Sequence, residues 1–392
     1  MLPQAQRLLR LAAALALPQA SSWSGPRVEV VQGDGLPSFE LTFGNGSTQR
    51  TPALWLVGGE ASLFDRVARF NTSEARSHRE QVQADAVGVR IFSAELSFVG
   101  YGSSPELLPD GSVAPAAMAF LGRALAQAPD ALFIARIRLD LKAPYDPRSR
   151  TRPGSVVMQS IANSSDVVAD HLASPTRAWA ARLGNLTARA MRSLDAAFPG
   201  RVLGAQILHG VSYEANYPGA WSAASVEGMP AGIYDHKWPD YSPDAIEDFC
   251  RGRSGGCAAP TAAQRNRPTL GNTLITADTA AGANAVAFNR FINVQMAEGI
   301  AAVGSAIKEA SGGRAFLTTL YGGSLFNGPS YATAGGSAAQ TELLGAAGID
   351  GTGNPPLCKH LHPHLISRDG SDQCHSSLRW RLADTAASRS DL

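Results

Sequence analysis

Chemically reactive side chains recur where apolar runs of the sequence end. Carboxylates, aromatic rings, an arginine and a histidine follow five such runs: Glu60, Glu95, Arg138, Asp140, His209, Tyr213, Glu214 and Tyr321. If these runs are the parallel strands of an α/β barrel, their carboxyl ends meet at one mouth and bring the side chains together. Aromatic faces stack on the apolar faces of sugar rings, and carboxylates accept hydrogen bonds from hydroxyl groups. The set is therefore suited to binding a carbohydrate.

Glu214 has the sequence surroundings that a proton donor needs. Glycosidases that retain anomeric configuration use two carboxyl groups about 5–5.5 Å apart, one as acid/base and one as nucleophile. The acid needs a raised pKa, which burial among aromatic side chains supplies. Tyr213 precedes Glu214, and Tyr217 and Trp221 follow closely. From position alone, a solvated loop glutamate is an equally good interpretation.

The elements that must position these side chains alternate between strand and helix. Apolar runs predict strands at 53–57, 87–92, 131–139, 202–208 and 315–321. Helical patterns predict helices at 77–86, 115–127, 175–198, 242–250, 285–310 and 337–346. A hairpin is expected over 28–43. Such alternation is the signature of a parallel sheet with crossover helices.

The predicted fold class is α/β, a (β/α)8 TIM barrel. No Gly-x-Gly-x-x-Gly turn or phosphate loop follows any predicted strand, so a doubly wound nucleotide-binding sheet is disfavoured and no cofactor is expected. We divide the chain into a signal peptide (1–22), an N-terminal β segment (23–52), a barrel (53–350) and an irregular tail (351–392). The barrel is expected to be incomplete, because strands seven and eight are not recognisable.

Composition narrows the possible partners. The chain has 392 residues, 44% of them hydrophobic and 17% charged, with a formal net charge of +1. These values are typical of a globular protein and disfavour electrostatic capture of nucleic acid or of an anionic membrane. Carbohydrate is the expected partner, and the sequence predicts no oligomeric state.

The first residues indicate a secreted protein. Arg7 and Arg10 precede the apolar run Leu11–Leu17, which small residues follow, as in a signal peptide. No stretch is long and apolar enough to span a bilayer. Four Asn-x-Ser/Thr sequons agree with a glycosylating route: Asn45, Asn71, Asn163 and Asn185.

The cysteines form two close pairs, Cys250 with Cys257 and Cys358 with Cys374. This spacing favours two local disulfides, and four free thiols in a reducing compartment are the alternative. The tail also holds His360, His362, His364 and His375. Structural zinc sites show closer cysteine pairs than these, so no metal site is expected.

Three segments carry a resemblance to a known family: RVLGAQILHGVSYEANYPG (201–219), WPDYSPDAIEDFCRGR (238–253) and AAVGSAIKEASGGRAFLTTLYGG (301–323). From about Trp55 to Asp350 the chain resembles the barrel domain of β-galactosidase-like glycoside hydrolases related to family 42, in the clan of retaining barrel enzymes. The resemblance implies that Glu214 is the acid/base at the end of strand four. The clan usually has Asn before this glutamate, where this chain has Tyr213. The clan's nucleophile, a glutamate at the end of strand seven, has no recognisable counterpart here.

The resemblance implies hydrolysis of a β-linked glycoside, such as a galactoside, by a retaining mechanism. The expected substrate-binding residues are Glu60, Arg138, Asp140, His209, Tyr213, Trp221 and Tyr321. Because no nucleophile is recognised, an inactive carbohydrate-binding barrel or a truncated product is the alternative. A barrel lyase or aldolase ranks last, because no lysine stands at a convincing strand end.

Overall fold

The computed structural model describes residues 23–32, 38–53, 56–57, 90–98, 105–127, 129–139, 177–209, 241, 243–253, 256–261, 264, 280–320 and 348–353. The chain divides into two compact units. The first comprises Met1–Pro144, Pro175–Leu208 and Gly299–Leu317, and the second comprises Tyr145–Ser174, His209–Glu298 and Thr318–Leu392. The helices predicted at 77–86 and 337–346 lie outside the described residues.

A small antiparallel sheet opens the first unit. Strands β1 (Arg27–Val31), β2 (Ser38–Thr42) and β3 (Thr48–Pro52) pair in the order β1-β2-β3. The hairpin predicted over 28–43 is thus present, and β3 is a third strand that the apolar pattern missed because its residues are mostly polar and exposed. Phe39 of β2 is buried, and its ring lies 5.1 Å from that of Phe316.

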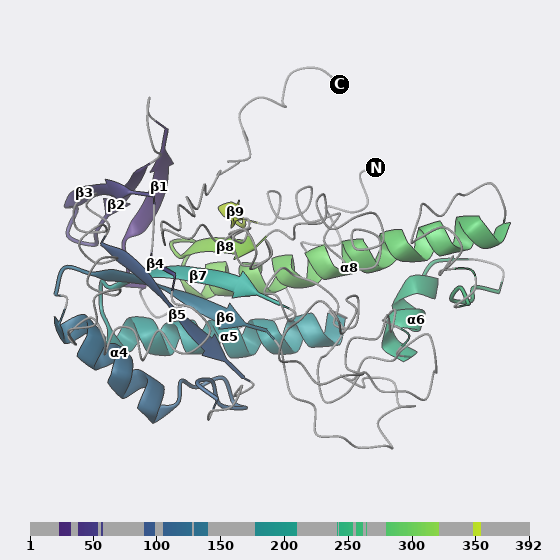
Figure 1. The fold of residues 1–392 in the computed structure, drawn as a ribbon, viewed down its shortest axis with the longest axis horizontal. Coiled ribbons are helices and arrows are strands. Elements are labelled where there is room, and N and C mark those ends of the chain that lie inside the picture. Colours follow the sequence, from purple (N-terminus) through teal and green to yellow (C-terminus); the bar gives the residue numbers. More distant parts are fainter. Residues whose placement is uncertain are drawn as a thin grey trace, which may run out of the picture. The chain divides into compact units, whose positions relative to one another are not determined.

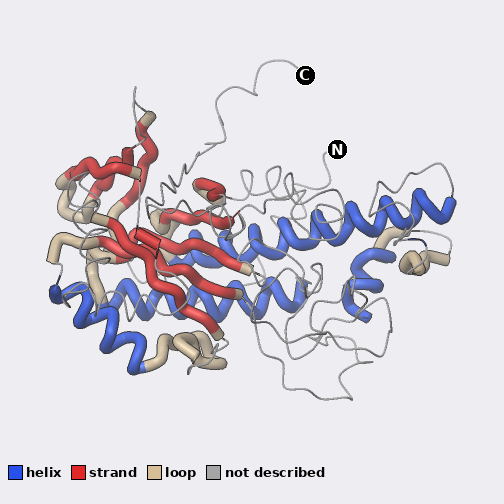
Figure 2. Tube along the Cα trace, viewed as in Figure 1, coloured by secondary structure: helices blue, strands red, loops and turns tan. Residues whose placement is uncertain are grey.

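The larger sheet is parallel in every strand pair whose register is resolved. Its strands are β4 (Leu56–Val57), β5 (Ile91–Ser97), β6 (Leu132–Arg138), β7 (Val202–Leu208), β8 (Phe316–Leu320) and β9 (Gly351–Gly353). Figures 1 and 2 show these strands, whose spatial order is β4-β5-β6-β7-β8-β9. Each strand thus lies beside its neighbour in sequence, as in a barrel, whereas a doubly wound sheet reverses its order at a switch point. The described residues establish an α/β protein with a parallel sheet, and closure into a complete barrel stays a prediction.

Two observed strands, β5 and β9, differ from the prediction. The strand predicted at 87–92 is β5, which begins at Ile91 and continues to Ser97. Glu95 therefore lies within the strand and not after it. The pattern also gave no strand after 350, yet Gly351–Gly353 pairs in parallel with Thr318–Leu320. A Gly-Thr-Gly segment has no apolar periodicity, so only its ladder with β8 identifies β9.

The crossover helices follow the predicted ranges closely. They are α4 (Pro115–Gln127), α5 (Arg177–Ala197), α6 (Pro243–Cys250) and α8 (Ala280–Ala310). Proline at the first helical position is tolerated because its missing N–H would have no intrahelical partner, and both α4 and α6 begin in this way. Helix α8 ends at Ala310, and a turn follows in which Gly312 and Gly313 have φ of 59° and 78°. The backbone N–H of Gly313 donates to the Lys308 carbonyl over 2.7 Å, closing the helix end.

Helix α5 packs against β7 and against the end of α8 that belongs to the first unit. Trp179, Leu183, Met191 and Leu194 form its buried stripe. At Gly184 the helices approach so closely that an added Cβ would lie 3.1 Å from the Cβ of Ala306. Small residues at this crossing therefore set the distance between the two helices.

The segment that follows the predicted signal peptide is held within the first unit. The Asp195 carboxylate accepts hydrogen bonds from the backbone N–H of Ser24 (2.8 Å), the Ser24 hydroxyl (2.8 Å) and the backbone N–H of Gly25 (3.0 Å). Arg314 donates to the carbonyl of Trp23 over 3.0 Å. Trp23 is itself buried. Residues 23–25 are thus part of the folded structure.

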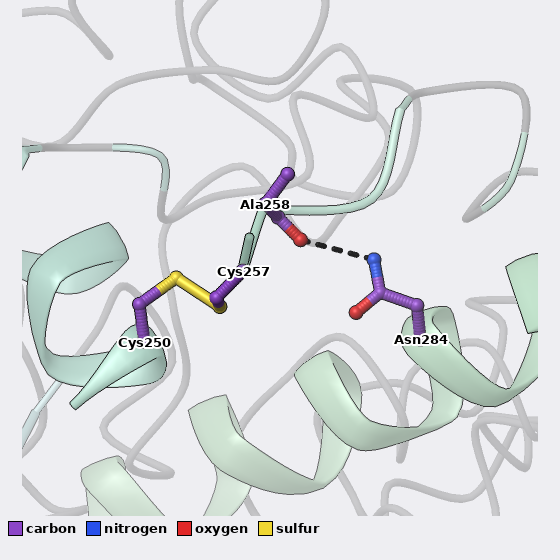
Figure 3. Close-up of a disulfide and its surroundings, with 4 residues drawn as sticks. All are labelled: Cys250, Cys257, Ala258 and Asn284. Carbon is purple, nitrogen blue, oxygen red and sulfur yellow. Dashed lines mark hydrogen bonds between the residues drawn. A yellow bond between two sulfur atoms is a disulfide. The ribbon is translucent and has the colours of Figure 1, made fainter. Parts of the chain in front are cut away.

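A disulfide joins Cys250, the last residue of α6, to Cys257. It is the first of the two predicted pairs, and Cys358 and Cys374 lie outside the described residues. Figure 3 shows the bridge beside Asn284 of α8, whose amide nitrogen donates to the carbonyl of Ala258 over 3.0 Å. The disulfide thereby ties the end of α6 to a segment that α8 also holds.

Candidate active site

One face of strands β5, β6 and β7 carries polar side chains. Glu95, Arg136 and Gln206 share one register level, and Ser97 and Arg138 share the level nearer the carboxyl ends. Side chains alternate between two faces along a strand, so residues two apart lie on the same face. We call these five residues the polar ladder. Four of them are buried, and Glu95 is partly exposed.

The other face of the same three strands is apolar and buried: Phe92, Ala94, Leu96, Phe133, Ala135, Ile137, Ala205 and Ile207. The three strands are thus largely buried on both faces, and one of the two faces carries polar and charged side chains. In (β/α)8 barrels the helices cover the outside of the sheet, and the site lies at the carboxyl ends of the strands. The polar ladder occupies the carboxyl-terminal halves of its strands.

Arg138 and Glu95 form an ion pair between β6 and β5. The Arg138 Nη1 lies 3.8 Å from the Glu95 Oε1. The Arg138 side chain is 5% exposed and that of Glu95 is 24% exposed. A guanidinium of such low exposure needs compensating charge or hydrogen bonds. Removing a charged group from water costs roughly several kcal/mol of free energy. Glu95 supplies part of that compensation and keeps one edge toward solvent.

Arg136 lies deeper on the same face. Its Nε donates to the Oε1 of Gln206 over 3.1 Å, from β6 to β7. The bond fixes the plane of the guanidinium, because Nε lies within the rigid fork that Arg presents. The two arginines therefore connect three neighbouring strands, Arg138 toward β5 and Arg136 toward β7.

A second carboxyl group, Glu106, lies beside the end of β5. Its Oε2 accepts a hydrogen bond from the backbone N–H of Ser97 over 3.2 Å, and the backbone N–H of Leu107 donates to the Ser97 carbonyl over 3.0 Å. Burial raises the pKa of Glu106, and the nearby negative charge of Glu95 raises it further, against backbone hydrogen bonds that lower it. Glu95 and Glu106 thus occupy unlike environments, one beside a guanidinium and one desolvated.

Of the eight predicted site residues, the structure describes two. Arg138 is the last residue of β6 and belongs to the polar ladder, and His209 follows β7 directly and is fully buried. Glu95, which stood among the strand-end residues, is brought to Arg138. Outside the described residues lie Glu60, Asp140, Tyr213, Glu214, Trp221 and Tyr321.

Sequence reasoning missed Arg136, Gln206 and Glu106. The signal for Arg136 was present: Arg136 and Arg138 are two residues apart in a strand, so they share a face. Gln206 lies within a run that was interpreted as uniformly buried and apolar. Glu106 could not be found from the pattern, since a backbone contact with β5 brings it to the sheet.

The described ranges contain neither a cluster of metal-binding side chains nor a helix able to span a membrane. No group of three or more His, Cys, Asp or Glu residues there could hold a metal ion. Nor does any helix in those ranges have the length and apolar character needed to cross a membrane.

Comparison with known proteins gives a likeness at the level of structure. No protein-family model and no curated protein matches the sequence. Among solved structures, the chain is similar to the catalytic domain of β-amylase from Paenibacillus polymyxa, with a TM-score of 0.50 and 14% sequence identity. The match covers 78% of this chain and 76% of that chain. The likeness is one of fold. It accords with the parallel sheet described above.

Proposed function

We propose that this protein is a glycoside hydrolase that cleaves a β-linked glycoside by a retaining acid/base mechanism. The polar ladder carries the proposal. It places a carboxylate and two guanidinium groups on one face of a parallel sheet, in the carboxyl-terminal halves of the strands. Charged and amide groups of this kind form hydrogen bonds with the many hydroxyls of a sugar.

The neighbouring fold and the sequence motifs support the same class. The solved structure to which the chain is similar is a β-amylase catalytic domain. The first of the three family-42-like segments contains β7, the second contains α6, and the third contains the end of α8 together with β8. A β-galactosidase-like preference rests on those segments alone.

Glu214 is the proposed proton donor. It would protonate the glycosidic oxygen while a nucleophilic carboxylate attacks the anomeric carbon, which breaks the glycosidic bond and leaves a glycosyl-enzyme. Glu214 would then take a proton from water as that water attacks the same carbon and frees the nucleophile. The nucleophile has no assigned residue. Sugar contacts are proposed for Arg138 and Glu95, together with Glu60, Asp140, His209, Tyr213, Trp221 and Tyr321.

A carbohydrate-binding protein without catalysis is the second candidate. One observation favours it: Glu95, the carboxylate of the polar ladder, lies beside the Arg138 guanidinium. A carboxylate held in an ion pair is a better hydrogen-bond acceptor for hydroxyls than it is a nucleophile, because the pair stabilises its charge.

We also propose that the chain follows the secretory route. The Cys250–Cys257 disulfide supports an oxidising compartment. Removal of residues 1–22 would leave Trp23, Ser24 and Gly25, whose contacts with Asp195 and Arg314 do not involve the preceding residues.

The test is hydrolysis of nitrophenyl β-galactoside and a panel of other nitrophenyl glycosides by the purified chain and its Glu214→Gln variant. The matched control is Glu247→Gln, on an exposed side of α6, where Arg251 is the partner that the described residues give the carboxylate. Loss of a general acid lowers the rate about 10²–10⁴-fold. We expect that loss in Glu214→Gln and an unchanged rate in Glu247→Gln.

A folded parent chain that is inert toward the whole panel would reject hydrolysis. Binding of a monosaccharide or disaccharide by that inert chain, measured by calorimetry, would favour the second candidate. Equal activity of the parent and Glu214→Gln would instead remove Glu214 from the mechanism and leave the class of reaction standing.

A further inference from the structure

Two of the four sequons fall among the described residues, and their surroundings differ. We propose that Asn45 is a site of N-linked glycosylation and that Asn185 is not. The sequences Asn45-Gly46-Ser47 and Asn185-Leu186-Thr187 satisfy the acceptor pattern equally well. The distinction therefore comes from structure alone. The sequons at Asn71 and Asn163 lie outside the described residues.

Asn45 lies in the tight turn between β2 and β3. The backbone N–H of Gly46 donates to the Phe43 carbonyl over 3.0 Å, and that of Phe43 donates to the Ser47 carbonyl over 2.9 Å. Gly46 has φ of 81°, a left-handed conformation that closes such hairpin turns. Asn45 is thus at the tip of the hairpin.

The hydrogen bonds of the Asn45 side chain involve its oxygen Oδ1 and not its nitrogen Nδ2 in the described structure. Its Oδ1 accepts hydrogen bonds from the backbone N–H of Ser47 (3.0 Å) and from the Ser47 hydroxyl (2.7 Å). Among the described residues, no hydrogen bond engages Nδ2, which is the atom that a glycan would bond. The serine of the sequon therefore orients the amide and leaves the reactive atom accessible.

The turn also has room for a bulky substituent. Residues 44–50 are all exposed. A Cβ atom added at Gly44 or Gly46, on either side of Asn45, would have nothing within 4 Å. An oligosaccharide at this tip would displace no packed side chain of the described structure.

Asn185 is half-buried, unlike the exposed Asn45. It lies in the middle of α5, and Thr187 of its sequon is fully buried with Oγ1 donating to the Leu183 carbonyl over 2.7 Å. The preceding residue, Gly184, packs against Ala306. The backbone of the following residue, Leu186, lies close to Gly111. A Cβ added at Gly111 would lie 2.7 Å from the Leu186 carbonyl oxygen. The residues on both sides of Asn185 therefore pack against other elements of the first unit, and the hydroxyl of its sequon is engaged within the helix.

The covalent step needs a glycosyl donor, a lipid-linked oligosaccharyl diphosphate. The Asn45 Nδ2 attacks the anomeric carbon of the donor's first sugar and forms an N-glycosidic bond. The bond between that carbon and the phosphate oxygen breaks, the lipid diphosphate leaves with the bonding electrons, and a base of the transferase takes the amide proton. Glycosylation at Asn45 rests on the proposed secretory route and is independent of any hydrolase activity.

The experiment is translation of the full chain in the presence of endoplasmic-reticulum microsomes, followed by protease treatment to select imported chains. Peptide N-glycosidase, which converts a glycosylated Asn to Asp, then marks the modified positions for peptide mass spectrometry. We expect conversion at Asn45 and none at Asn185. The Asn45→Gln and Ser47→Ala variants should each lose one glycan, Ser47→Thr should keep it, and Asn185→Gln should match the parent.

Three outcomes would overturn the inference. Imported chain that is unmodified at Asn45 rejects the site, and modification at Asn185 rejects the structural distinction. Chain that remains protease-sensitive and unmodified was never imported, which rejects the route and the site with it. Modification is scored on the imported polypeptide, so the readout needs no purified protein.

Discussion

The guanidinium of Arg138 lies 3.8 Å from the carboxylate of Glu95, across two neighbouring parallel strands. The pair stands at the boundary between the buried sheet and the solvent-facing end of the polar ladder. The Arg138 side chain is buried, whereas that of Glu95 is 24% exposed. The pair therefore joins two roles, holding a buried charge and offering a polar surface.

Glu95→Gln is expected to lower the free energy of unfolding by about 1–2 kcal/mol, as measured by urea denaturation. Exposed ion pairs contribute little to stability, and breaking a buried pair costs more. The expected value lies between the two because Glu95 is partly exposed. The Glu247→Gln change in an exposed pair should cost about 0.5 kcal/mol or less. The double variant with Arg138→Met closes a mutant cycle, and additive effects there would show that the two groups are not coupled.

Glu106→Gln is expected to raise stability at neutral pH and to have little effect in acid. Burial raises the pKa of Glu106, so the folded state favours its neutral form. The stability that this group contributes is fully present below its ordinary pKa and is lost as the pH rises through the raised folded value. Glutamine keeps a carbonyl oxygen for the Ser97 N–H and carries no charge. Urea titrations across this pH range should show the gap between variant and parent widening as the pH rises.

Asp110 provides a control for that titration, because its pKa is shifted in the opposite direction. The Ser112 hydroxyl and backbone N–H, which donate to Asp110, lower the pKa of its exposed carboxyl. Asp110 therefore contributes stability above its ordinary pKa and loses it as the pH falls through the folded value. Asp110→Asn should be less stable than the parent at neutral pH. A Glu106→Gln variant that behaved in the same way would contradict the assigned environment.

Gly204→Ala is expected to destabilise the protein by at least about 3 kcal/mol or to prevent folding. A Cβ at this position of β7 would collide with the backbone carbonyl of Phe316 in β8, which cannot move without disturbing the sheet. Gly122→Ala in α4 is the matched control, since its Cβ would meet only the Phe198 ring at 3.7 Å. That helical change should stabilise by about 0.5–1 kcal/mol. Equal thermal midpoints for the two variants would contradict the observed closeness of β7 and β8.

The elements with simple burial patterns were predictable from the sequence. Helix α4 and strand β7 have the predicted bounds, because Pro115 marks the helix start and 202–208 is a nearly uniform apolar run. Strand β5 was placed too early because from Ser93 onward it alternates between polar residues (Ser93, Glu95 and Ser97) and apolar ones. Polar residues on one face of the sheet break the apolar run without ending the strand.

The site was less predictable than the fold. Arg138 was placed correctly at a strand end, since strand ends follow from apolar runs. Its partner Glu95 and the Arg136–Gln206 bond depend on the register between strands, which no local pattern encodes. Glu106 depends on how a connecting segment returns to β5. Pairwise contacts across strands are thus the information that single-sequence patterns lack.

The disulfide between Cys250 and Cys257 has a consequence for the timing of biosynthesis. Its two cysteines are seven positions apart, whereas the next cysteine in the chain is Cys358. A ribosome adds about 5–20 residues per second, while a loop of about ten residues closes in about 10–100 ns. In a chain entering an oxidising lumen, these thiols would therefore meet many times before a third thiol exists. Vectorial synthesis alone favours the native pairing and excludes the competing ones during that interval.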